Sequence, residues 1–223
     1  MKISANYWIF EGGLDGTLPI ADAMKQAAQL GYDVIELCIA SQGVLTQKTT
    51  QAECETFCEE AQKNGLEISG VASGESWGRS PTSYDPEVRQ SIIDFTKKSL
   101  QITKWLGTDA YLFVPGAVDV FFLPDGEVVP YDVCYQRATD SIFQIAPTAE
   151  KLGVSIAVEN VWNKFLLSPL EMRSFIDQFH SRNVGAYFDV GNVLLTGYPE
   201  QWISILGSRI KRIHIKDFKR SIG

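Results

Sequence analysis

The regular alternation between two kinds of segment constrains the fold of this chain most strongly. Short runs rich in β-branched and other apolar residues recur along its 223 residues, and each is followed by a stretch with helical hydrophobic period. The expected strands are Lys2–Tyr7, Asp33–Ile39, Leu66–Ala72, Ala110–Val114, Val154–Glu159, Val184–Asp189 and Arg209–Lys216. The expected helices are Pro19–Leu30, Gln51–Asn64, Pro86–Leu106, Val133–Leu152, Pro169–His180 and Pro199–Leu206. This pattern is typical of an α/β protein.

Local signals at the ends of these segments agree with the alternation. Glycines stand where the C′ position of four helices would fall: Gly31, Gly65, Gly107 and Gly153. Two helices open with a capping residue followed by proline, in Asp85-Pro86 and Ser168-Pro169. No Pro/Gly/Ser-rich linker or low-complexity tract divides the chain, so we expect a single domain over residues 1–223.

Two parallel α/β architectures fit this order of elements. Strand segments that are continuously apolar predict a parallel sheet covered on both sides, either an open doubly wound sheet or a closed barrel. The open sheet usually carries a glycine-rich phosphate turn after its first strand, and the corresponding turn here, Glu11–Gly16, is acidic. We therefore favour a (β/α)8 TIM barrel. Seven expected strands precede Gly223, so we expect the eighth βα unit to be missing from this chain.

Composition narrows the classes of partner. The formal net charge is -7 at pH 7 and the chain has only two histidines, which disfavours nucleic-acid binding and a multi-zinc nuclease. No apolar run reaches the roughly 18 residues of a membrane span, and the N-terminus lacks the pattern of a signal peptide. The four cysteines therefore fit packing in a reducing compartment better than a disulfide framework. We expect a cytoplasmic protein with neither a membrane nor a nucleic-acid partner.

Metal-capable side chains close three consecutive strands. Glu159, Asp189 and His214 stand at or near the ends of the fifth, sixth and seventh expected strands. The carboxyl ends of barrel strands meet at one face, so these side chains are expected to converge. Two carboxylates and an imidazole suit one divalent ion such as Mn²⁺, Mg²⁺, Co²⁺ or Zn²⁺. The alternative is three separate hydrogen bonds to neighbouring loops, which requires a coincidence at three adjacent strand ends.

The residues around these positions resemble a known family, the xylose-isomerase-like barrels of sugar and sugar-phosphate isomerases and epimerases. The resemblance spans essentially the whole chain and is most specific in three segments: Val158–Asn160, Tyr187–Asn192 and Arg212–Asp217. It implies that Glu159, Asp189 and His214 bind one divalent ion, and that Glu159 is also a catalytic base. It further implies a fourth ligand, a Glu after the eighth strand, which has no counterpart in this sequence.

A second set of residues is expected to contact the substrate. In the ketose 3-epimerases of that superfamily an Arg six residues after the metal-binding His contacts substrate, and Arg220 has that spacing. Asn192 stands three residues after the metal-binding Asp, where those relatives have a His, and Phe165 stands six residues after Glu159, where they have a Glu. The ketohexose epimerase subgroup is therefore not implied. Lys216 lies with Lys219 and Arg220 after the seventh strand, where barrels often bind phosphate. A solvated basic face is the alternative for these three side chains.

Aromatic and acidic side chains complete the expected site. Trp8 and Trp162 follow the first and fifth strands, as Trp77 follows the third, and such rings can wall a sugar pocket by stacking. Glu36 lies midway along the second strand. Two roles stay open for its carboxylate: a hydrogen bond to a substrate hydroxyl, or a structural hydrogen bond within the protein.

The sequence thus predicts a divalent-metal-dependent isomerase or epimerase of a small sugar or sugar phosphate. The implied reaction moves a proton at the carbon α to a carbonyl through a metal-stabilised enediolate. Two alternatives stay open: a keto-cyclitol or keto-acid dehydratase on the same metal site, and a non-catalytic sugar-binding barrel. Barrels of this kind often pair, so a homodimer is one expectation for the assembly.

Overall fold

Seven parallel strands form the centre of the molecule, and each lies within a segment predicted to be a strand. The computed structural model describes residues 2–123 and 125–218. The strands pair in chain order, from β1 to β7, into one parallel sheet. Their bounds are β1 Ser4–Asn6, β2 Val34–Cys38, β3 Glu67–Ala72, β4 Ala110–Phe113, β5 Ser155–Glu159, β6 Val184–Asp189 and β7 Ile210–His214.

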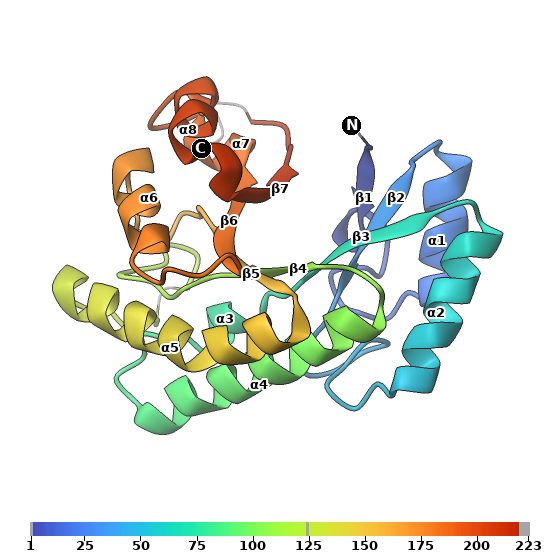
Figure 1. The fold of residues 1–223 in the computed structure, drawn as a ribbon, viewed down its shortest axis with the longest axis horizontal. Coiled ribbons are helices and arrows are strands. Elements are labelled where there is room, and N and C mark those ends of the chain that lie inside the picture. The colour runs from blue at the N-terminus through green and yellow to red at the C-terminus, as the bar shows by residue number, and fades with distance from the viewer. Residues whose placement is uncertain (1, 124, 219–223) are drawn as a thin grey trace.

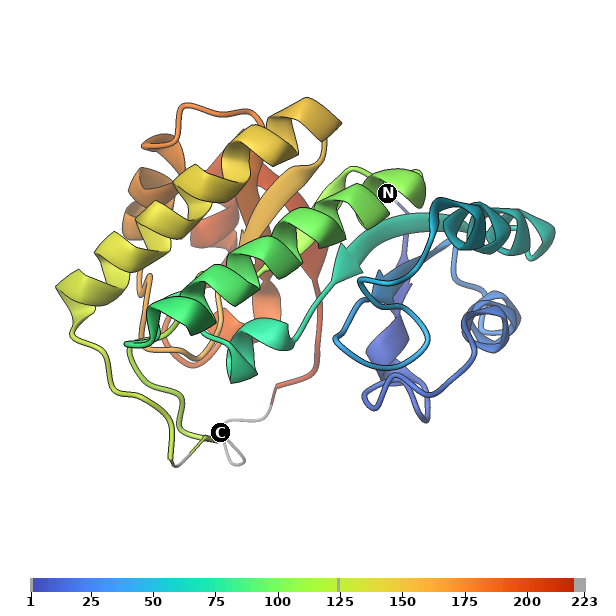
Figure 2. The ribbon, with the colours of Figure 1, turned by 90° about the horizontal axis from the view of Figure 1, so that it is seen from below.

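Helices connect successive strands and cover the outside of the sheet. In Figure 1, α1 and α2 flank the first strands, while α4 and α5 run side by side beneath β4 and β5, as Figure 2 also shows. The six predicted helices are α1 Ile20–Gln29, α2 Gln51–Lys63, α4 Pro86–Trp105, α5 Tyr131–Leu152, α6 Pro169–Asp177 and α8 Pro199–Leu206. Four short elements were not predicted: the helices α3 Glu75–Gly78 and α7 Val190–Val193, and the 3-10 turns η1 Tyr7–Ile9 and η2 Gly207–Arg209.

The predicted helix ends are confirmed at both proline sites and at the glycines. The Asp85 side chain accepts the backbone N–H of Glu87 at 2.8 Å, and Ser168 accepts that of Glu171 at 3.2 Å. Gly153 follows α5 with φ 66°, a left-handed conformation that other residues adopt at a cost. These signals end the helices where the next strand must begin.

The sheet curls, which brings its last strand back towards the first ones. Arg212 on β7 donates from Nε to the carbonyl oxygen of Ser69 on β3 at 2.7 Å, across the interior. His214, also on β7, lies 2.8 Å from a carboxylate oxygen of Glu36 on β2. Such contacts between non-adjacent strands require a closed curvature. The fold is therefore an α/β TIM barrel with seven strands in the described ranges, which confirms the predicted architecture.

Strand side chains alternate between two cores. On β4, Tyr111 and Phe113 pack into the large core under the helices, whereas Leu112 packs into a small cluster inside the barrel with Ala157 and Tyr187. This parity continues along each strand, because successive side chains point to opposite faces. The inward-facing positions are therefore Glu36 and Cys38 on β2, Ala157 and Glu159 on β5, Tyr187 and Asp189 on β6, and Arg212 and His214 on β7.

Two predictions about the chain as a whole have outcomes in this structure. All four cysteines are free thiols, and Cys54 and Cys134 are fully buried, which agrees with packing rather than a disulfide framework. None of the helices in the described part of the chain combines the length and apolar character that crossing a bilayer requires.

Candidate metal centre

Glu159, Asp189 and His214 meet inside the mouth of the barrel. They are the last residues of β5, β6 and β7, and the register pairs Asp189 directly with His214. One ligand atom from each of the three lies within 4.8 Å of the others. The convergence predicted from the strand ends is therefore present in the fold. It follows from inward parity and from the alignment of neighbouring parallel strands.

The imidazole of His214 lies between two carboxylates. Its Nδ1 is 3.3 Å from Oε1 of Glu159, and its Nε2 is 2.8 Å from Oε2 of Glu36. Burial lowers the pKa of His214, but the hydrogen bonds and negative charges of Glu159 and Glu36 outweigh it and raise the pKa to about 10. The ring thus supplies positive charge to a site with several carboxylates until a cation replaces its proton.

Glu159 carries a raised pKa. The largest cause is burial, and the nearby charge of Asp189 acts in the same direction. The hydrogen bond and charge of His214 lower the pKa but do not offset these effects. A carboxylate with a raised pKa is a stronger base than one in water, which suits proton abstraction.

A ladder of amide hydrogen bonds fixes Asp189 beside the end of β5. Asn160 accepts the backbone N–H of Asp189 at 2.9 Å and donates to its carbonyl at 2.8 Å. Asn192 donates its side-chain amide to the carbonyl of Asn160 at 2.8 Å. The Asp189 carboxylate caps α7 by accepting the backbone N–H of Asn192 at 2.8 Å. These bonds leave the second oxygen, Oδ2, directed towards other partners.

The donor set fits a divalent cation. Ligands of such an ion lie at about 2.0–2.2 Å from it, so opposed ligand atoms are about 4 Å apart. The three atoms within 4.8 Å need only a small inward movement to reach that spacing. Two carboxylate oxygens and one imidazole nitrogen are ligands shared by Mn²⁺, Mg²⁺, Co²⁺ and Zn²⁺ sites. The side chains present therefore fit the predicted metal ion.

Lys216 extends over the metal centre from the segment after β7. Its ammonium donates to Oδ1 of Asn192 at 2.6 Å and lies 3.3 Å from Oδ2 of Asp189. It also stands 5.0 Å from the centre of the Trp162 ring. The lysine stem passes over Gly191, where a Cβ would lie 2.4 Å from Cγ of Lys216. The predicted residues Lys216, Asn192 and Trp162 thus form one cluster beside the carboxylates.

Trp8 lies on the other side of the barrel mouth. It follows β1 in η1, and its backbone N–H donates to the side chain of Asn6 at 2.7 Å. Trp8 and Trp77 both pack on the small cluster inside the barrel and line one cavity of about 360 Å³ together with Cys38. Two of the three predicted rings thus line one cavity, at the ends of β1 to β3, whereas Trp162 lines another. A sugar-binding role for these rings stays a prediction.

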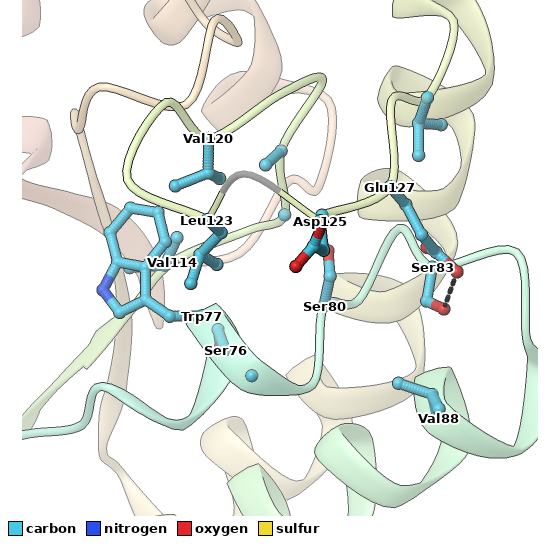
Figure 3. A pocket seen from close by; sticks show the side chains of 15 residues that line it. Ser76, Trp77, Ser80, Ser83, Val88, Val114, Val120, Leu123, Asp125 and Glu127 are labelled. Carbon is cyan, nitrogen blue, oxygen red and sulfur yellow. Dashed lines mark hydrogen bonds between the residues drawn. The ribbon is translucent and has the colours of Figure 1, made fainter.

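Two further cavities open at the same end of the barrel. One, of about 490 Å³, lies between Trp77 and the 117–129 loop, and Figure 3 shows Ser83 there donating to Glu127. The other, of about 920 Å³, is largely apolar and is bounded by Asn160, Trp162 and Asn192. Cavities with room for a small organic molecule thus open near the candidate metal centre.

Two residues of the predicted basic cluster lie outside the described part of the chain, whereas Arg79 and Phe165 lie within it. Lys219 and Arg220 lie outside the described residues, so their roles stay predictions. Arg79 donates to Glu75 and Ser41 on the β2–β3 side. Phe165, which stands where the ketose 3-epimerases have a Glu, is buried in the main core.

Sequence reasoning assigned no role to Asn160 and Gly191. Both lie inside the quoted motifs, directly after Glu159 and two residues after Asp189. An amide immediately beyond a strand-end carboxylate was the available signal for Asn160. The contact between Gly191 and Lys216 joins residues 25 positions apart, so no local pattern could have indicated it.

Comparison with known proteins finds similarity over nearly the whole chain. The family model described as "Xylose isomerase-like TIM barrel" matches residues 24–223. A D-psicose 3-epimerase solved in the presence of D-fructose shares 20% identity, with a TM-score of 0.81, over 97% of this chain and 73% of that chain. A D-psicose 3-epimerase from Clostridium cellulolyticum H10, solved with D-tagatose, shares 17% identity, with a TM-score of 0.80, over the same fractions.

A third solved structure of similar fold is that of an epimerase with a different named reaction. The 3-keto-D-glucoside 4-epimerase from E. coli shares 14% identity, with a TM-score of 0.76, over 97% of this chain and 79% of that chain. At these identities the structures establish a common fold. A comparison with curated protein sequences gives no match. Because the family model covers nearly the whole chain, the protein belongs to the xylose isomerase-like TIM barrel family.

Proposed function

We propose that this protein is a divalent-metal-dependent isomerase or epimerase of a small sugar or sugar phosphate. The observation that carries the proposal is the convergence of Glu159, Asp189 and His214 at the ends of three neighbouring strands. Active sites of TIM barrels lie at this end, and a cluster of titratable groups with shifted pKa values is typical of a catalytic site. The solved structures of similar fold carry the names of sugar epimerases, which agrees with this substrate class.

The chain's own residues divide the work of such a reaction. A bound divalent ion would polarise the substrate carbonyl and stabilise the enediolate that forms when the neighbouring carbon loses its proton. Asp189, His214 and one oxygen of Glu159 would hold that ion. Glu159 is the base, because its buried carboxylate has a raised pKa and stands at the same centre. The carbon-bound proton passes to an oxygen of Glu159 and returns from it to the adjacent carbon, while the hydroxyl proton moves to the former carbonyl oxygen, which completes a one-base isomerisation.

Lys216 binds the substrate's negatively charged or hydroxyl oxygens. Its ammonium is already held at the centre by Asn192 and Asp189, so little further ordering is needed when a substrate oxygen arrives. Trp162 lies beside the ammonium and Trp8 lies across the mouth, where flat rings can contact the apolar face of a sugar. Arg220 is proposed to add a second basic contact.

Proton exchange tests the proposal directly. The metal-loaded protein, incubated with ketoses and ketose phosphates in deuterium oxide, should incorporate deuterium at the carbon α to the carbonyl, detected by NMR. Glu159→Gln should lower this exchange by about 10²–10⁴-fold at saturating metal, because the amide cannot accept the proton. A matched control is Glu75→Gln, at the same end of the barrel but hydrogen-bonded to Ser41 and Arg79.

Two results would contradict the assignment. Exchange that persists in Glu159→Gln removes this residue from the role of base. Absence of exchange with every sugar tested, combined with a product lighter by one water, would instead assign the centre to a dehydratase.

A further inference from the structure

Glu36 is a buried carboxylate whose two oxygens are both occupied by protein groups. It lies in the middle of β2, faces the barrel interior and is 2% exposed. Oε1 accepts the hydroxyl of Tyr187 from β6. Oε2 accepts the side-chain amide of Asn6 from β1 and lies 2.8 Å from Nε2 of His214 on β7. One side chain thus joins strands from opposite sides of the barrel, beneath the candidate metal centre.

The chemistry of these partners determines which atom carries each proton. The amide of Asn6 and the hydroxyl of Tyr187 are donors, so Glu36 serves both of them as an acceptor. An ionised carboxylate has only acceptor sites, and a buried one needs several donors to replace water. Nε2 of His214 completes the set when it carries the ring proton and donates it to Oε2. Without a metal ion the other ring nitrogen, Nδ1, donates to Glu159; when a cation replaces its proton, Nδ1 keeps a lone pair on that side.

We propose that Glu36 is a positioning residue that holds His214 in its Nε2–H tautomer and presents Nδ1 to a divalent ion. Metal-binding histidines commonly donate their second ring N–H to a carboxylate, which fixes both tautomer and ring orientation. The inference rests on the metal site of the proposed function, but not on its substrate or reaction. Of the two roles that the sequence left open for Glu36, this proposal assigns the structural one, a hydrogen bond within the protein.

The surrounding packing supports a fixed ring rather than a mobile contact. The Tyr187 ring packs against the His214 ring, with centroids 4.6 Å apart, while its hydroxyl reaches Glu36. Gly70 on β3 leaves room for that hydroxyl, because a Cβ at this position would lie only 3.2 Å from it. Tyr187 thus supports the imidazole by its face and the carboxylate by its hydroxyl.

The tautomer can be observed without any substrate. Long-range ¹H–¹⁵N correlation spectra of the Zn²⁺-loaded full chain resolve both nitrogens of each imidazole, and the chain has only two histidines. His214 should show a protonated Nε2 and a metal-bound Nδ1. His180, exposed beyond the end of α6, serves as an internal control that should not respond to Zn²⁺. A metal-bound Nε2, or a protonated Nδ1, would overturn the proposal.

A pair of variants separates positioning from general stability. Glu36→Gln keeps the shape but presents an amide to three donors, and it should weaken Zn²⁺ binding by about 10–100-fold in calorimetry. Tyr187→Phe keeps the ring and removes only one donor to Glu36, so its Zn²⁺ affinity should change by less than about threefold. Both variants should retain the circular dichroism spectrum of the folded chain. Unchanged affinity in a folded Glu36→Gln would overturn the proposal.

Failure of this inference and failure of the proposed function give different results. If Glu36→Gln does not fold, the spectrum of the unmodified chain still decides the tautomer. Zn²⁺ binding through Nδ1 without proton exchange on any sugar would contradict the proposed function and leave the role of Glu36 supported. Proton exchange on a sugar with the metal bound through Nε2 would support the proposed function and contradict the role of Glu36.

Discussion

Two carboxylates at the same end of the barrel, Glu75 and Glu159, have opposite environments. Burial acts to raise the pKa of both carboxylates, but the net shifts have opposite directions. Glu75, after β3, accepts the hydroxyl and backbone N–H of Ser41 and an N–H of Arg79, and these donors lower its pKa below the ordinary value. Glu159, at the end of β5, has His214 as its one close donor among the residues that the structure describes and faces the charge of Asp189, so its pKa stays raised.

The difference indicates which half of the barrel mouth has carboxylates that an added cation would stabilise. Beyond the ends of β2 and β3, the carboxylate of Glu75 is already paired with the Arg79 cation and accepts hydrogen bonds from Ser41. This carboxylate therefore contributes to structure.

At the ends of β5 to β7, Glu159 shares the imidazole of His214 with Glu36, and Asp189 faces the ammonium of Lys216. Three carboxylates thus face two cationic side chains, and that arrangement gains most from an added cation. Residue type is therefore a weaker guide to function than the number of donors that each carboxylate receives.

The largest expected effect is on metal affinity when a carboxylate is removed from each half. Asp189→Ala should lower the affinity for Mn²⁺ or Zn²⁺ by more than about 100-fold. Loss of a residue that only supports a ligand lowers metal affinity by about 10–100-fold, and loss of a ligand itself should have a larger effect. Glu75→Ala removes a carboxylate that already has three donors, and should leave metal affinity within about twofold. Calorimetric titration of both variants measures the contrast. Equal losses in the two variants, or none in Asp189→Ala, would show that the ion binds elsewhere.

A smaller effect should follow from moving Lys216 without touching a ligand. In Gly191→Ala the new methyl group would overlap the lysine stem, which is flexible and can swing out of the centre. Loss of one charge-assisted hydrogen bond to the substrate should raise KM by about tenfold, while metal affinity stays unchanged. Gly78→Ala is the matched control, because a Cβ there meets nothing within 4 Å. If KM is equal in the two variants, Lys216 does not bind substrate.

The sequence predicted the strands, the six long helices and the three converging side chains because each depends on local information. Hydrophobic period marks elements, capping residues mark their ends, and strand parity places Glu159, Asp189 and His214 on the inner face. The short helices α3 and α7 were not predicted. Each has only four residues and begins within three residues of a strand end, so neither shows a helical period.

Contacts between distant strands were beyond prediction from the sequence. Glu36 and His214 are 178 residues apart, and their hydrogen bond depends on the curvature of the whole sheet. The pairing of Glu75 with Ser41 across 34 residues is of the same kind. Sequence reasoning could therefore name which carboxylates lie at strand ends, but not which of them already have donors. That distinction separates the two halves of the site.

The smallest effect should come from the aromatic wall on the β1 side. Trp8 lines a cavity with Trp77 and Cys38 that the three candidate metal ligands do not border, so Trp8→Ala should leave metal affinity unchanged. Loss of ring stacking worth about 1 kcal/mol corresponds to a rise in KM of about fivefold. Trp8→Phe keeps a flat ring and should recover most of the difference. If Trp8→Ala changes metal affinity rather than KM, the two halves of the mouth are coupled, and the division drawn between them is wrong.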